Sequence, residues 1–303
     1  MKNKKKQDIL EKKGKKMSLK KIYVIIGPTA SGKSGLAVRL AKFLDGSVVN
    51  ADSMQIYKDL SIISARPTLA ETEGIPHLLY GYLDAWTQGS VQDWLTKVIP
   101  VLKEVDNPVL VGGTGLYFSS LINGINEIPP IDDKVRQTVR QMDLDEVRQR
   151  VKNAPFTDPQ RLRRALEVQL ATGKPLSYFQ SLPLKKLYHA DFKVIFINPA
   201  RHLLYQNCEK RFHQMIEQGG IEEVQALLKL NPTGGVLKAI GVPEIISFLQ
   251  GDITKDQMTQ QAILSTRHYA KRQITWFRHQ LKSDIVLSRP DELSIPELIN
   301  RCQ

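Results

Sequence analysis

The sequence predicts an α/β protein in which a parallel sheet with flanking helices is interrupted by a small helical insertion. The β-branched stretch 22–26 indicates a buried strand, and the apolar spacing after residue 34 indicates a helix. A second strand is predicted at 47–51, and a strand–helix–strand unit of this length implies a right-handed crossover between parallel strands. The apolar stretch 108–111 adds a third strand to the same sheet.

The segment GPTASGKS, residues 27–34, fits the phosphate-loop pattern G-x-x-x-x-G-K-[ST] between a strand and a helix. Gly27 and Gly32 allow backbone N–H groups to surround phosphate oxygens, and the helix N-terminus adds partial positive charge. Lys33 supplies a charge to the outer phosphate, and the Ser34 hydroxyl is a ligand for Mg²⁺. A plain glycine turn is the alternative, but all motif positions and both flanks fit. We therefore predict a core like that of P-loop NTPases and a phosphorylated ligand.

Two further segments follow predicted strands and lie at the same edge of the sheet. Asp52 ends the second strand, where it is either a general base or a turn aspartate; spacing does not decide between them. Gly112-Gly113-Thr114 follows the third strand and is either a turn or a close backbone approach to a ligand, with one hydroxyl. An ATPase is expected to carry an acid there, so this segment disfavours that reading and leaves small-molecule kinases open.

The insertion is predicted at 123–188, between core segments 21–122 and 189–303. Residues 131–180 are rich in arginine and poor in strand formers. They contain a helix start at Asp158-Pro159 and a helix end at Gly173. Later helices are predicted at 201–218, 220–229 and 256–280, and a last strand at 284–287.

Charge is concentrated at the start of the chain. The net charge is +12, and residues 1–21 carry ten lysines against Asp8 and Glu11, so the rest is only mildly basic. Residues 1–20 are either a disordered basic arm or the result of a start site that belongs at Met17. The chain has two cysteines, no apolar run of about 20 residues and no secretory signal, so we expect a cytoplasmic protein without membrane contact.

The predicted C-terminal helix carries a basic and aromatic pattern. Arg267, Lys271 and Arg278 recur at helical spacing with Tyr269 and Trp276 between them. This pattern is either an exposed helix face or a surface for RNA phosphates and bases.

Several segments together carry a family resemblance. They are GPTASGKS (27–34), DSMQIYKDL (52–60), LVGGTGLYF (110–118), DPQRLRRALEV (158–168), RFHQMIEQG (211–219), KAIGVPE (238–244) and AKRQITWFR (270–278). In this order they resemble the tRNA dimethylallyltransferases. The resemblance implies transfer of a dimethylallyl group from dimethylallyl diphosphate to N6 of the adenosine 3′ of the anticodon, in tRNAs that read codons beginning with U.

The resemblance also implies roles for individual residues. Diphosphate and Mg²⁺ would bind at Thr29, Ala30, Ser31, Gly32, Lys33 and Ser34, and Asp52 would be the general base. Thr114 would lie near the reacting centre. Contacts to tRNA would come from Asp52, Ser53, Met54, Gln55, Arg136, Gln160, Arg161, Leu162, Arg163, Arg164, Lys238 and Gly241, with Arg267 and Lys271 added from the C-terminal helix. The partners are then the anticodon stem-loop of tRNA and dimethylallyl diphosphate, and we expect a monomer.

The sequence departs from the family pattern at a few positions. Ile63 and Ser64 stand where many members have glycine and threonine, and Asn207 stands where they typically have arginine. Arg211, one helical turn after Asn207, is the expected replacement at the diphosphate. Three alternatives remain: a kinase using ATP at the P-loop, a transferase acting on free adenine nucleotides, and a non-catalytic RNA-binding protein.

Overall fold

The computed structural model describes residues 19–152 and 154–303. The expectations for the basic tail and for Met17 lie outside the described residues. The chain divides into two compact units, one formed by the core up to Ser120 with His189–Gln303, the other by Leu121–Tyr188. Each unit is described by itself below.

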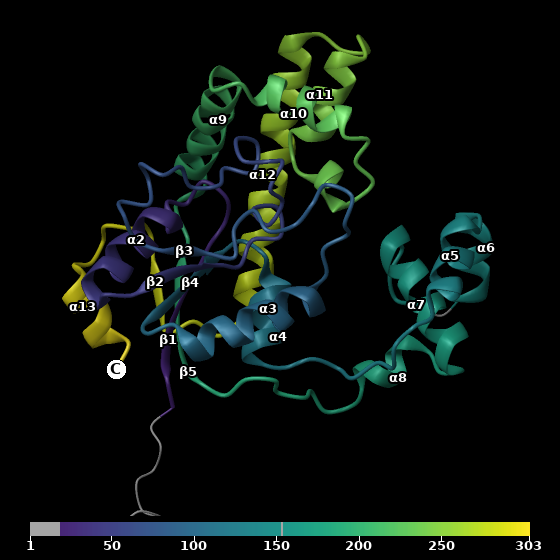
Figure 1. Ribbon diagram of the computed structural model, residues 1–303, viewed down its shortest axis with the longest axis horizontal. Coiled ribbons are helices and arrows are strands. Elements are labelled where there is room, and N and C mark those ends of the chain that lie inside the picture. Colours follow the sequence, from purple (N-terminus) through teal and green to yellow (C-terminus); the bar gives the residue numbers. More distant parts are fainter. Residues whose placement is uncertain (1–18, 153) are drawn as a thin grey trace, which may run out of the picture. The chain divides into compact units, whose positions relative to one another are not determined.

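The core unit is built on a six-stranded parallel sheet with strand order β3-β2-β4-β1-β5-β6 (Figure 1). The strands are β1 (Lys21–Ile26), β2 (Ser47–Asn50), β3 (His77–Leu78), β4 (Pro108–Gly112), β5 (Asp191–Ile197) and β6 (Ile285–Leu287). The predicted fold class, α/β with a P-loop NTPase-like parallel sheet, is confirmed. The two-residue strand β3 has no counterpart in the sequence-based prediction.

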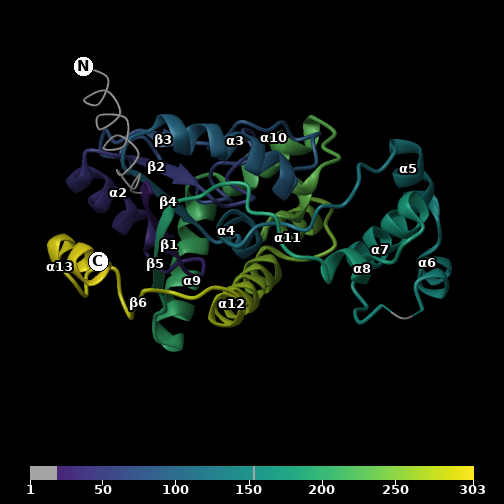
Figure 2. The ribbon, with the colours of Figure 1, turned by 90° about the horizontal axis from the view of Figure 1, so that it is seen from below.

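Helices cover both faces of this sheet (Figure 2). On one face, helix α2 (Lys33–Leu44) and helix α13 (Ile295–Arg301) pack over alternate strand residues, among them Tyr23, Ile25 and Ile195. On the other face, Phe196 of β5 meets Phe277 at 5.8 Å between ring centroids, and Phe277 meets Phe118 of helix α4 (Gly115–Ile122) at 6.4 Å. Burial on both faces explains why the central strands are almost uniformly apolar.

The remaining helices of the core unit follow β3 and β5 in the chain. They are α3 (Val91–Glu104), α9 (Arg201–Glu217), α10 (Gly220–Lys229), the 3₁₀ helix η1 (Gly235–Lys238), α11 (Val242–Leu249) and α12 (Lys255–Gln280). An apolar cluster that includes Ile63, Phe212 and Met258 joins α9, α10, η1, α11 and α12 to the irregular segment after β2. No helix in the described part of the chain is both long and apolar enough to cross a bilayer.

The described residues of the second unit form the helices α5 (Asp133–Gln141), α6 (Leu144–Arg150), α7 (Pro159–Thr172) and α8 (Leu176–Gln180). The predicted limits of α7 are confirmed: the Asp158 carboxylate accepts the Arg161 N–H at 2.9 Å, and Gly173 ends the helix at φ 69°. Asp132 and Asp143 cap α5 and α6 in the same way. The unit has its own small apolar core around Val139, Val147 and Leu166.

Candidate active site

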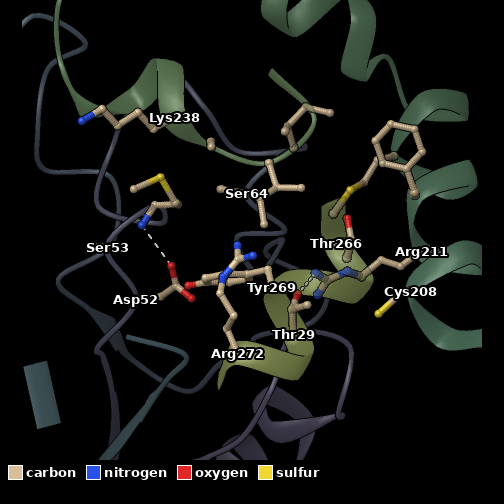
Figure 3. A pocket seen from close by; sticks show the side chains of 16 residues that line it. Thr29, Asp52, Ser53, Ser64, Cys208, Arg211, Lys238, Thr266, Tyr269 and Arg272 are labelled. Atoms are coloured by element: carbon tan, nitrogen blue, oxygen red, sulfur yellow. Dashed lines mark hydrogen bonds between the residues drawn. The ribbon is translucent and has the colours of Figure 1, made fainter. Parts of the chain in front are cut away.

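A cavity of about 300 Å³ lies beyond the carboxyl ends of the parallel strands, where sheets of this kind bind ligands (Figure 3). Its walls come from the P-loop, from the segment after β2, and from helices α9 and α12. The lining residues are Thr29, Asp52, Ser53, Met54, Ile63, Ser64, Cys208, Arg211, Phe212, Met215, Lys238, Ala239, Ile240, Thr266, Tyr269 and Arg272. The cavity therefore joins cations and a carboxylate to an apolar wall.

Asp52 is held by a compact turn at the end of β2. Its N–H donates to Asn50 Oδ1 at 2.9 Å, and its Oδ1 accepts the Met54 N–H at 2.9 Å. Asn50 is itself anchored, because its side-chain amide donates to the Leu79 carbonyl at 3.0 Å. Among the described residues nothing donates a hydrogen bond to Asp52 Oδ2, so one carboxylate oxygen can accept a proton from a ligand.

Thr114 is fixed against the Asp52 turn. Its Oγ1 accepts the Ser53 N–H at 2.8 Å and lies 3.1 Å from Ser53 Oγ, while its own N–H donates to the Ala51 carbonyl at 3.3 Å. This contact is possible because β4 lies next to β2 and both strands end at the same level. Thr114 thus supports the residues that line the cavity.

The P-loop backbone is left-handed at two positions. Ala30 and Gly32 have φ of 61° and 80°, and α2 begins at Lys33 without a side-chain cap, so its first N–H groups are available to an anion. Lys33 Nζ donates to the Pro28 carbonyl at 3.1 Å. Burial lowers the pKa of Lys33 to about 8, an effect opposed by the charge of Asp52 and reinforced by Arg211. The Ser31 hydroxyl is buried without a hydrogen-bond partner in the described structure.

Helix α9 presents two residues to the P-loop. Arg211 donates from Nη2 to Thr29 Oγ1, and Asn207 Nδ2 donates to the Ala30 carbonyl at 3.3 Å. Burial lowers the pKa of Arg211, and the nearby Cys208 and Asp52 oppose this effect by raising it. Arg211, expected from the sequence to replace a missing arginine, therefore lines the cavity beside the P-loop.

Some of the other residues singled out in the sequence line this cavity, and others do not. Lys238, Ile63 and Ser64 line it. Gln55 does not; its side chain donates to the carbonyls of Ser64 and Ala65 at 3.1 and 2.8 Å, and so holds the segment after β2 in shape. Gly241 is the N-cap of α11 at φ 97°.

On the basic face of α12, one of the predicted cations is paired with a carboxylate within the protein. Arg267 forms an ion pair with Glu209 at 2.7 Å and stacks on Tyr205 at 5.4 Å from the ring centroid. Lys271 has no ion pair among the described residues, and it lines a separate hollow of about 420 Å³ with Arg201 and Arg278.

The predicted tRNA-contacting residues of the second unit differ in accessibility. Leu162 is 3% exposed in the apolar core of that unit, and Arg163 donates to the carbonyls of Val139 and Met142, the latter at 3.0 Å. Both side chains therefore make contacts within their own unit and are not available to contact tRNA. Arg136, Gln160, Arg161 and Arg164 reach the surface; Arg136 lies 3.8 Å from Asp133, Arg161 stacks over Phe156 at 5.0 Å, and Arg164 pairs with Glu167 at 3.3 Å.

Sequence reasoning did not assign several residues that the structure brings to the site. Cys208, Phe212 and Met215 form one apolar wall from α9, and Arg272 lines the opposite side from α12. Gln273 joins the P-loop at Thr29 to the loop after β4 at Gly113. These residues recur at helical spacing in the sequence, but spacing alone does not show which face of a helix meets a cavity.

The protein supplies few ligands of its own for a metal ion. The described residues contain no group of three or more His, Cys, Asp or Glu side chains that could hold one. Mg²⁺ is commonly bound by few protein oxygens together with substrate phosphates, and the Ser34 hydroxyl at the start of α2 fits such a shared site.

The chain is similar to known proteins over most of its length. The sequence model of the IPP transferase family matches residues 55–280. The chain belongs to this family. A tRNA dimethylallyltransferase from a Bradyrhizobium strain is 42% identical over 282 residues, covering 87% of this chain and 92% of that protein. One from Rickettsia felis is 38% identical over 305 residues, covering 94% and 98%.

Solved structures of the IPP transferase family share the fold. The tRNA isopentenylpyrophosphate transferase of Bacillus halodurans matches with a TM-score of 0.68 and 29% identity, over 93% of this chain and 94% of that one. A eukaryotic dimethylallyltransferase acting on tRNA matches with a TM-score of 0.72 and 29% identity, over 85% and 70%.

Proposed function

We propose that this protein transfers a dimethylallyl group from dimethylallyl diphosphate to N6 of the adenosine 3′ of the anticodon, in tRNAs that read codons beginning with U. The allylic C–O bond breaks, the N6–C bond forms, diphosphate leaves, and the N6 proton passes to Asp52. The observation that carries the proposal is the cavity in which Thr29 and Arg211 of the diphosphate side meet Asp52 and an apolar wall.

The positive charges beside the P-loop can stabilise a departing diphosphate. Negative charge grows on the leaving group, and Lys33, Arg211 and the N–H groups at the start of α2 lie where they can stabilise it. The unpartnered Ser31 hydroxyl gains an acceptor if a phosphate oxygen binds in the loop. Ser34 would hold a Mg²⁺ ion, which would supply further stabilisation of the negative charge on the leaving group when bound.

The nucleophile side suits an adenine. Asp52 has one carboxylate oxygen to which none of the described residues donates a hydrogen bond. Tyr269 offers a flat surface to a base, and Met54 offers a flexible apolar one. The adenosine must leave its stack to enter the cavity, which costs a few kcal/mol that contacts to tRNA offset. We assign those contacts to Ser53, Lys238 and the surface residues Arg136, Gln160, Arg161 and Arg164. That the protein is a monomer and that it is located in the cytoplasm both remain predictions.

A kinase using ATP is not favoured. Strand β4 ends at Gly112 and is followed by Gly113 and Thr114, where a triphosphatase is expected to place a metal-binding acid. The curated relatives are dimethylallyltransferases.

A single labelling experiment tests the proposal. The protein is incubated with ¹⁴C-labelled dimethylallyl diphosphate or γ-³²P-ATP, each with unmodified tRNA or with AMP. We expect label only from the prenyl donor and only in tRNA, at the adenosine 3′ of the anticodon. Transfer to AMP, or phosphate transfer from ATP, would contradict the assignment.

The pKa of Lys33 leads to a pH-dependent affinity. The ligand-free amine titrates at about 8, and a bound diphosphate raises its pKa because it favours the charged form. Binding above pH 8 therefore takes up a proton, and the affinity for dimethylallyl diphosphate should fall by up to about tenfold per pH unit above 8. The substrate is fully ionised in this range, since its last pKa is about 6.

Calorimetry in two buffers of different ionisation enthalpy measures this proton uptake. Lys33→Met should bind more weakly and show no uptake near pH 8.5. An equal dissociation constant at pH 7 and pH 9 in the unmodified protein would show that Lys33 does not carry the effect.

Arg161 and Arg164 are expected to contact tRNA phosphates. Replacing both by glutamine should weaken tRNA binding and reduce the slope of log K against log salt by about one to two. Affinity for dimethylallyl diphosphate should not change. The matched control replaces Lys103 and Arg301, exposed residues of α3 and α13, by glutamine. An equal change of slope in both double variants would mean that only net charge matters.

A further inference from the structure

Gln273 connects two loops that are far apart in the sequence. It lies on α12, is 6% exposed, and uses both ends of its side-chain amide. Its Oε1 accepts the Thr29 N–H at 2.8 Å, across 244 residues of sequence, and its Nε2 donates to the Gly113 carbonyl at 2.9 Å, across 160 residues. One rigid planar group thus spans the two loops.

The two loops carry opposite halves of the proposed reaction. Thr29 belongs to the P-loop, and its hydroxyl accepts a hydrogen bond from Arg211. Gly113 precedes Thr114, which is bonded to Ser53 beside Asp52. The P-loop and the Asp52 turn are therefore connected through Gln273, Gly113 and Thr114.

The surroundings are shaped for this side chain. A Cβ added to Gly113 would collide with the Gln273 amide and come within 3.2 Å of Asp52 Oδ2, so the absence of a side chain there lets the amide approach. Tyr269, one turn earlier on α12, lines the cavity and is within hydrogen-bonding reach of Gln273. Of the side chains of similar length, glutamate lacks the donor and methionine lacks both groups.

We propose that Gln273 is a positioning residue that sets the distance between the diphosphate loop and the Asp52 turn. This inference rests on the proposed function. Displacement of reacting groups by about 1 Å costs on the order of a hundredfold in rate, whereas each loop keeps its own contacts to its own ligand. Loss of the connection should therefore lower the rate of transfer more than the affinity for either substrate.

The test compares Gln273→Met, which removes both hydrogen bonds, with Gln273→Glu, which keeps only the acceptor. The control is Phe277→Leu, one turn later on the same helix, where an aromatic core contact is lost outside the cavity. For each variant, the single-turnover rate of transfer is measured with saturating tRNA and dimethylallyl diphosphate. The dissociation constants of the two substrates are measured separately.

We expect both Gln273 variants to lose about tenfold to thirtyfold in single-turnover rate, with dissociation constants within about threefold of the unmodified protein. Phe277→Leu should lower the melting temperature with little change in rate. The inference is overturned if the Gln273 variants transfer at normal rate, if they lose affinity as much as rate, or if Phe277→Leu loses rate equally. Absence of transfer by the unmodified protein would instead refute the proposed function.

Discussion

Asp52→Asn should lower kcat by about a hundredfold to ten-thousandfold while both substrates still bind. The amide keeps the size of the side chain, and its Oδ1 can still accept the Met54 N–H, so the turn after β2 is preserved. It cannot accept a proton from the adenine N6. The interaction that is lost belongs to the transition state, and the deficit should appear in kcat and not in the dissociation constants.

Rapid-quench kinetics at saturating substrates measures this loss. Asp84→Asn is the matched control, because it removes a carboxylate that pairs with Lys58 outside the cavity. Near-normal kcat in Asp52→Asn would remove Asp52 from the mechanism. An equal loss in Asp84→Asn would indicate an effect of net charge.

The positions of the P-loop and of the Asp52 turn were predictable because they follow from the topology of a parallel sheet. Strands β2, β4 and β1 are neighbours, so the segments after them meet at one edge. The motif at 27–34 and the aspartate at 52 each follow a recognisable strand. The sequence therefore predicted that these two segments meet at one edge of the sheet, and Thr29 and Asp52 line the same cavity there. Their roles in the reaction stay a prediction.

Residues on helices were harder to assign, since their roles depend on which neighbour their face meets. Gln273 lies in a segment whose basic and aromatic pattern suggested RNA contact, yet its side chain is buried between two loops. Leu162 and Arg163 lie in a segment that resembles a tRNA-binding motif, but the first is core and the second binds carbonyls of its own unit. A motif transferred by position does not show where each side chain points.

The departure from the family pattern at Asn207 leads to the second large effect. Arg211→Ala should lower kcat/KM for dimethylallyl diphosphate by about a hundredfold, because a cation beside the leaving group is removed from a buried position. Asn207 lies one turn earlier on α9 and reaches the Ala30 carbonyl of the same loop. An arginine there could approach the diphosphate, so Asn207→Arg should raise kcat/KM by up to about tenfold.

The double variant separates the two contributions. If both side chains serve the same leaving group, Asn207→Arg should restore part of the rate lost in Arg211→Ala, and the two effects should not add. Lys210→Ala, an exposed neighbour of Arg211 on α9 that does not line the cavity, is the control for loss of charge. Repulsion from Arg211 limits the gain in the single variant, since like charges four residues apart on a helix destabilise each other, and this limit disappears in the double variant. If neither single variant changed kcat/KM, α9 would take no part in stabilising the diphosphate, even though Arg211 and Asn207 contact the P-loop.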